Sequence, residues 1–149
     1  MRKTWLGAVL LVSLVAGLGA TAFGHARLVR SEPAANAEVS VAPLAVCLWF
    51  SEPVEKALSS FEVKDANGNR VDDLDRWRES ADSKGTGDSV TLPLKAVGPG
   101  EYTVSWRVLS VDTHTLSGEF KFVVLPGAEV VGAAESEGTA QVRCDVPVS

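Results

Sequence analysis

Short runs in which apolar and polar residues alternate fill the chain from Val46 to Val124. Alternate side chains of a β-strand point to opposite faces of its sheet, so such a run predicts a strand with one buried face. The apolar positions of the clearest runs are Val46, Leu48 and Phe50; Phe61 and Val63; Tyr102, Val104, Trp106 and Val108; and Phe120, Phe122 and Val124. This part of the sequence has no long segment of helical period. The pattern therefore predicts an all-β domain.

Turn residues separate these runs. Asp65-Ala66-Asn67-Gly68-Asn69 contains residue types that tolerate a positive φ, and Gly98-Pro99-Gly100 marks another turn. Pro93 has no N–H to donate, so the apolar run that contains it is expected at a sheet edge or a strand end. With a further strand near residues 26–30, roughly six to eight strands fit about 100 residues. This is the size of an immunoglobulin-like Greek-key β-sandwich or barrel of about seven strands.

Two segments lie outside this pattern. The stretch from Val71 to Ser89 is charged and contains two glycines, so we expect a solvated loop. The alternative is a helical turn in which Leu74 and Trp77 pack on the sandwich. The tail from Pro126 to Ser149 is rich in Gly, Ala and Glu and predicts no further strand.

The N-terminus has the pattern of a secretory signal peptide. Arg2 and Lys3 precede an apolar run from Trp5 to about Ala22, and Ala22-Phe23-Gly24 offers small residues at the −3 and −1 positions of a cleavage site. An uncleaved membrane anchor needs about 20 apolar residues, for which this run is marginal. Cleavage would leave His25 as the first residue of a chain exported to the periplasm or the cell exterior. The predicted organisation is a signal peptide at residues 1–24, one domain at residues 25–125 and a tail at residues 126–149.

Charge and cysteines are interpreted for the exported chain. Removing Arg2 and Lys3 from the 14 basic residues leaves 12 against 19 acidic residues, and the formal charge changes from −5 to −7. An acidic surface argues against nucleic acid or anionic lipid as a partner. Cys47 and Cys144 would face an oxidising compartment, which favours a disulfide. A copper-thiolate site is the alternative, but neither cysteine has a neighbouring His, Cys or Met to add soft ligands.

The chain has two histidines, and one of them, His25, lies at the predicted cleavage point. An N-terminal histidine offers its α-amine and its ring Nδ1 to one metal, and an α-amine with a pKa near ~7.8 can become a neutral ligand at physiological pH. In the precursor the same nitrogen is an amide, so the chelate forms only after cleavage.

The second histidine, His114, lies two residues after Asp112, and in an extended segment both side chains point to the same side. Either feature alone is more often structural. Together with His25 they supply three nitrogens and one oxygen, a donor set that suits tetragonal Cu(II). We therefore predict one Cu(II) per chain.

Three segments resemble the CopC family of copper-resistance proteins, and together they cover nearly the whole predicted domain. They are residues 25–34 (HARLVRSEPA), residues 48–54 (LWFSEPV) and residues 100–118 (GEYTVSWRVLSVDTHTLSG). The resemblance implies a small periplasmic Greek-key β-protein that binds Cu(II) through His25, Asp112 and His114. Glu52 matches a family acidic residue near the site and would either orient a ligand or remain an exposed strand-end carboxylate. The resemblance also implies a membrane copper importer of the CopD type as partner.

Some members of this family also bind Cu(I) in a methionine-rich loop. This chain has no methionine after Met1, so its composition excludes a thioether site. The leading hypothesis is a monomeric, non-enzymatic protein with one Cu(II) site that buffers or delivers copper. The alternatives are a copper-dependent oxidative enzyme of the polysaccharide-monooxygenase type, in which Asp112 would occupy the position that oxygen needs, and a sandwich that binds no metal.

Overall fold

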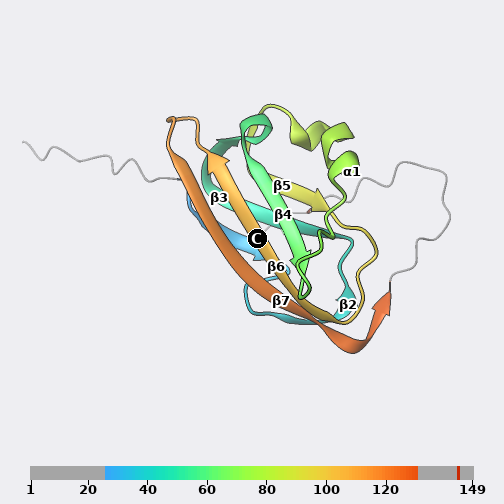
Figure 1. Cartoon of the computed structure of the whole chain (residues 1–149). Coiled ribbons are helices and arrows are strands. Elements are labelled where there is room, and N and C mark those ends of the chain that lie inside the picture. Colours follow the sequence, from blue (N-terminus) through green and yellow to red (C-terminus); the bar gives the residue numbers. More distant parts are fainter. Residues whose placement is uncertain (1–25, 131–143, 145–149) are drawn as a thin grey trace, which may run out of the picture.

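The strands of the computed structural model form two sheets packed face to face (Figure 1). The structure describes residues 26–130 and residue 144, so the predicted signal peptide lies outside the described residues. The elements are β1 (Leu28–Glu32), β2 (Glu38–Ala42), β3 (Ala45–Glu55), the 3-10 turn η1 (Lys56–Leu58), β4 (Ser60–Asp65), α1 (Leu74–Glu79), the 3-10 turn η2 (Ala81–Ser83), β5 (Thr86–Pro93), β6 (Gly100–Leu109) and β7 (Thr115–Val130). The predicted all-β sandwich of about seven strands is confirmed.

One sheet has the strand order β1-β3-β5 and the other β2-β7-β6-β4. Neighbouring strands are antiparallel except β2 and β7, which run parallel. The alternation pattern does not predict β2, a run of five residues that is mostly exposed and pairs with β7. β7 continues through Pro126 to Val130, so the tail assigned to residues 126–149 begins within a strand.

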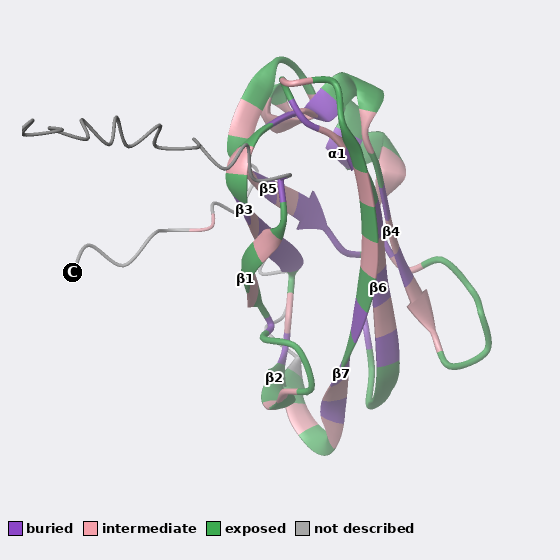
Figure 2. Cartoon of the chain, turned by 90° about the vertical axis from the view of Figure 1, so that its left-hand side faces the viewer, coloured by how far each residue is buried: buried purple, intermediate pink, exposed green. Residues whose placement is uncertain are grey.

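The buried faces of the strands are those that the alternation predicts. Val46 and Leu48 on β3 and Val104 on β6 are fully buried. Buried and less buried positions alternate along β6, as Figure 2 shows. Trp106 on β6 meets Phe50 on β3 edge-on, with ring centroids 6.4 Å apart, and so joins the two sheets.

The stretch from Val71 to Ser89 is not the solvated loop that we expected. Asp73 caps α1, because its side chain accepts a hydrogen bond from Arg76 N at 3.1 Å. The helix buries Trp77, whose ring lies edge-on to Phe61 at a centroid distance of 5.7 Å. The structure thus has the alternative arrangement, a helical turn in which Leu74 and Trp77 pack on the sandwich. Polar contacts also attach the segment, since Thr91 N donates to Asp82 Oδ2 at 2.6 Å. Among the described residues, no helix is long and apolar enough to cross a membrane.

The outer face of the β1-β3-β5 sheet carries the disulfide. Cys47 on β3 is bonded to Cys144, with Cα atoms 5.9 Å apart, which confirms the predicted pair. Thr91 Oγ1 donates a hydrogen bond to Cys144 Sγ at 3.0 Å. The bond leaves neither sulfur as a thiolate for copper. Beside it, the guanidinium of Arg30 lies 4.4 Å from the ring centroid of Trp49.

Candidate metal centre

Asp112 and His114 lie in the loop that joins β6 to β7, at one end of the sandwich (Figure 1). Ser110 N donates to His114 O at 2.9 Å, and Thr113 N donates to Ser110 O at 2.9 Å. Thr113 has a φ of 71°, which a β-branched residue rarely adopts. These backbone hydrogen bonds hold the loop in one shape and bring the Asp112 and His114 side chains together.

The two oxygens of Asp112 have different surroundings. Oδ1 accepts a hydrogen bond from Ser110 Oγ and a longer one, 3.4 Å, from His114 N. Oδ2 is buried and accepts no well-aligned hydrogen bond from a described residue, although His114 Nδ1 lies 3.0 Å away. The Ser110 hydroxyl, followed by contacts with His114, lowers the pKa of Asp112 below its usual value despite partial desolvation. The carboxylate is therefore ionised at neutral pH and has one oxygen without a well-aligned donor.

This geometry fits two adjacent positions of a tetragonal metal site. Donor atoms about 2.0 Å from such a metal and at right angles to each other lie about 2.8 Å apart. The observed separation of 3.0 Å between His114 Nδ1 and Asp112 Oδ2 is close to this value, and it is also that of an ordinary ion pair between the two side chains. The His114 side chain is 56% exposed, so a metal ion can reach it from solvent.

Ser110 also belongs to the site, although it is not among the predicted residues. Its residue is 1% exposed, and its hydroxyl contacts both the Asp112 carboxylate and the His114 carbonyl oxygen, the latter at 3.2 Å. The sequence carries no clear signal for this role, because it depends on the burial of Ser110 and on the shape of the loop. Ser110 orients the carboxylate through Oδ1, whereas the other oxygen, Oδ2, faces His114 Nδ1.

The start of the described chain and the β6–β7 loop are attached to the same end of β3. Arg27 N donates to Ser51 Oγ at 3.0 Å, and Ser51 N donates to Arg27 O at 2.9 Å. Two residues further along β3, Pro53 O accepts a hydrogen bond from Val111 N at 3.3 Å. The segments before β1 and after β6 are thus brought together by Ser51 and Pro53, two residues apart on β3.

The third predicted ligand, His25, lies outside the described residues, and its role stays a prediction. Within residues 26–130 and 144, no three His, Cys, Asp or Glu side chains are arranged to hold a metal ion. Glu52, half-buried on β3, does not complete such a group with Asp112 and His114. The described part of the chain therefore supplies two donors, and a four-donor site needs others.

Comparison with known proteins agrees with this architecture. A sequence model of the CopC domain matches residues 28–125. Protein YobA of Escherichia coli is 37% identical over 118 residues, which cover 78% of this chain and 90% of YobA. The copper transport protein CutJ of Bacillus subtilis is 33% identical over 124 residues, which cover 83% of this chain but 22% of CutJ.

A solved structure gives the same result. The crystal structure of CopC from Methylosinus trichosporium OB3b superposes with a TM-score of 0.57 at 33% sequence identity, covering 68% of this chain and 95% of that protein. The domain match spans more than half of the chain, and YobA is matched over nearly its whole length. The chain described above therefore belongs to the CopC family of copper-resistance and copper-transport proteins.

Proposed function

We propose that this chain is exported, is cleaved before His25 and binds one Cu(II) ion in the periplasm, which it buffers or delivers without catalysing a reaction. The main support is the attachment of residue 27 and the β6–β7 loop to neighbouring residues of β3. Two residues of chain span at most about 7 Å, so the link from Arg27 would keep the α-amine of residue 25 near the end of β3 that holds Ser51 and Pro53. The carbonyl of Pro53 already binds the loop that carries Asp112 and His114.

The proposed donors are the α-amine and ring Nδ1 of His25, the Asp112 carboxylate and the His114 imidazole. Asp112 is already ionised, because its pKa lies below the usual value. The three nitrogens, in contrast, must lose their protons before they can bind a metal. Acidification should therefore release copper, because protons compete with the metal for these nitrogens.

A membrane copper transporter is the proposed partner. In CutJ the segment that matches this chain is a small part of a much longer copper transport protein. A domain that is covalently joined to a transport protein in one organism suits a separate partner of the same kind in another. We therefore propose that this chain exchanges copper with a CopD-like membrane protein.

The oxidative-enzyme alternative has less support. Asp112 Oδ2 lies 3.0 Å from His114 Nδ1, beside the position where the imidazole would hold copper. The carboxylate would therefore fill a position that a copper monooxygenase keeps open for oxygen. Oxygen-dependent cleavage of a polysaccharide by the copper-loaded protein with ascorbate would contradict the proposal.

The decisive experiment changes only the N-terminal amine. Purified protein that begins at His25 is compared with a variant that carries one glycine ahead of His25, by titration with Cu(II) against a chromophoric chelator and by electron paramagnetic resonance. We expect one tight, nitrogen-rich Cu(II) site in the first protein and an affinity lower by about 100-fold or more in the second, since the amine chelate is lost.

The matched control carries one extra glycine after Ser149 and should bind like the parent protein. Equal affinity of the protein with and without the additional N-terminal residue would show that the amine of His25 is not a ligand.

A further inference from the structure

Ser110 is buried, although it stands at the start of an exposed loop. Its backbone forms an antiparallel bridge with Val54 of β3, and the next residue, Val111, is hydrogen-bonded through its N–H to Pro53 O. Ser110 N also donates to His114 O at 2.9 Å, across the loop. Backbone contacts with β3 and with the loop therefore fix the place of Ser110, and none of these contacts uses its hydroxyl.

The Ser110 hydroxyl has one proton and two oxygen atoms in reach. They are Asp112 Oδ1 and His114 O, the latter at 3.2 Å. His114 O already accepts a hydrogen bond from Ser110 N. An ionised carboxylate has no proton to donate, so the hydroxyl is the donor in its contact with Asp112, and a charged acceptor forms the stronger hydrogen bond. The hydroxyl proton is therefore directed to Oδ1 of Asp112.

The orientation of the Asp112 carboxylate depends on this hydrogen bond. Besides the hydroxyl, Oδ1 has only a long contact, 3.4 Å, with His114 N, while Oδ2 faces His114 Nδ1 at 3.0 Å. The torsion that turns a carboxylate has broad, roughly two-fold minima, so a single long contact would hold it weakly. Without the hydroxyl, either oxygen could therefore turn toward the imidazole.

We propose that Ser110 is a positioning residue for copper, whose hydroxyl occupies Oδ1 so that Asp112 binds the metal through Oδ2 alone and in one orientation. The inference rests on the proposed function, because it requires Asp112 to be a ligand. A carboxylate can bind a metal through one oxygen or through both. The tetragonal plane of Cu(II) takes four donors, and the three proposed nitrogens leave room in it for one oxygen.

A serine with a purely structural role would behave differently. If the hydroxyl served only to close the turn, its removal would weaken the fold and leave the bound copper unchanged. Ser59 is a suitable reference, because its Oγ donates to Glu55 O at 2.7 Å and accepts from Leu109 N, the residue before Ser110, at 3.1 Å. These two hydrogen bonds hold the backbone at the end of β6 and do not involve the Asp112 carboxylate.

The test compares Ser110→Ala with Ser59→Ala, each made in the protein that begins at His25. Ser110→Ala removes only the hydroxyl and keeps the backbone contacts of Ser110, so the variant should fold. Its Cu(II) affinity, measured against a chromophoric chelator, should fall about 10-fold, because an orienting partner of a ligand is lost. The affinity of Ser59→Ala should stay within about twofold of the parent value. Parent affinity in Ser110→Ala, or equal losses in the two variants, would overturn the proposal.

Electron paramagnetic resonance of the same proteins, loaded with one equivalent of Cu(II), gives a readout that a structural role would not change. The parent and Ser59→Ala should show one Cu(II) species with the same spectrum. Ser110→Ala should show a changed spectrum with more than one species, because its carboxylate is no longer held in one orientation. A single species identical to that of the parent would contradict the inference, whatever the affinity.

The variant Asp112→Asn separates this inference from the proposed function. If that variant keeps full Cu(II) affinity, the carboxylate is not a ligand and the proposed metal site is wrong, whatever Ser110→Ala does. If it loses affinity while Ser110→Ala keeps both the affinity and the spectrum of the parent, the role given to Ser110 alone is wrong.

Discussion

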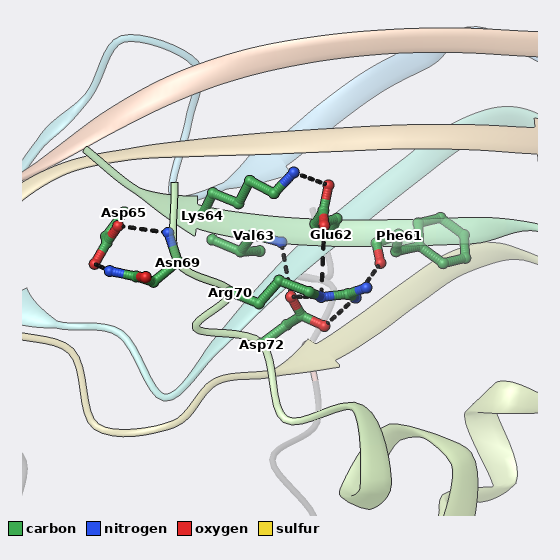
Figure 3. Close-up of polar contacts among 8 residues, drawn as sticks. All are labelled: Phe61, Glu62, Val63, Lys64, Asp65, Asn69, Arg70 and Asp72. Atoms are coloured by element: carbon green, nitrogen blue, oxygen red, sulfur yellow. Dashed lines mark hydrogen bonds and ion pairs between the residues drawn. The ribbon is translucent and has the colours of Figure 1, made fainter. Parts of the chain in front are cut away.

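Asp72 and Asp112 each lie two residues from a basic side chain, yet their surroundings differ completely. The Asp72 side chain is fully buried, and both of its oxygens are satisfied by Arg70 and the Val63 N–H (Figure 3). The Arg70 side chain donates to Asp72 Oδ2 at 2.6 Å and also to Phe61 O at 3.1 Å. Asp112 instead keeps one buried oxygen without a well-aligned donor, beside an exposed imidazole.

The difference supports our proposal that Asp112, and not Asp72, binds a metal. Arginine has no lone pair to offer, so the Arg70–Asp72 pair is complete in itself, and hydrogen bonding to Asp72 raises the pKa of Arg70. The pair attaches the segment after β4 to that strand. Histidine can coordinate through a neutral nitrogen, so Asp112 and His114 retain a shared capacity for a ligand. Similar spacing therefore serves stability in one place and, as we propose, copper binding in the other.

The largest expected effect is on folding. Asp72→Asn should lower the free energy of unfolding by about 3 kcal/mol, because the buried site loses its charge and sets an amide against Arg70. Arg70 is 40% exposed, so the buried end of the pair accounts for most of this loss. Urea unfolding at pH 7 measures it. The folded variant should bind Cu(II) with the affinity of the parent protein. If its Cu(II) affinity fell while its free energy of unfolding stayed the same, Asp72 would be the metal-binding aspartate and our assignment would be wrong.

The second prediction is the converse. Asp112→Asn keeps an acceptor for the Ser110 hydroxyl but removes the charge, so Cu(II) affinity should fall about 10- to 100-fold while the free energy of unfolding changes by less than about 1 kcal/mol. Chelator competition and urea unfolding on the same sample measure the two effects. A large loss of stability with unchanged copper affinity would make Asp112 a structural residue like Asp72.

The smallest effect concerns Asp65, in the turn that leads to Arg70. Hydrogen bonds from the side chain and then the backbone of Asn69 lower the pKa of Asp65 below that of the unfolded chain. Because the pKa of Asp65 is lower in the folded chain, its ionisation stabilises the fold at every pH above the pKa of an unfolded aspartate, about 3.9. This stabilisation is lost as the pH falls through the pKa of the folded chain. Asp65→Asn should therefore show a smaller loss of stability between pH 5 and pH 2. Unfolding curves for variant and parent with the same pH dependence would contradict this.

Much of the fold was predictable because it depends on local alternation. Val104 and Val108 are buried on β6 because every second residue of a strand faces the same side. β2 was not identified, since its ladder comes from β7, more than 80 residues away in the chain. We expected Trp77 in a solvated loop because the segment is charged on average. Its structure instead depends on particular contacts, such as that of Trp77 with Phe61 and that of Asp82 with Thr91 N.

The candidate site divides in the same way. Residue type and a spacing of two were enough to select Asp112 and His114 from the sequence. In an extended segment, side chains two residues apart point to the same side. The role of Ser110 depends on its burial and on the closed shape of the loop, neither of which a spacing reveals.

By itself, the sequence determined the alternating faces of the strands, the two cysteines that pair, the lack of thioether ligands and the residue types available for copper. These follow from chain periodicity and side-chain chemistry, which are local properties. Only the tertiary structure decided that Arg27 and Val111 attach to neighbouring residues of β3, that Asp72 is satisfied while Asp112 is not, and that Leu58 stays exposed. These features depend on contacts between segments that are far apart in the chain. Such contacts determine which buried polar atoms have a hydrogen-bond partner.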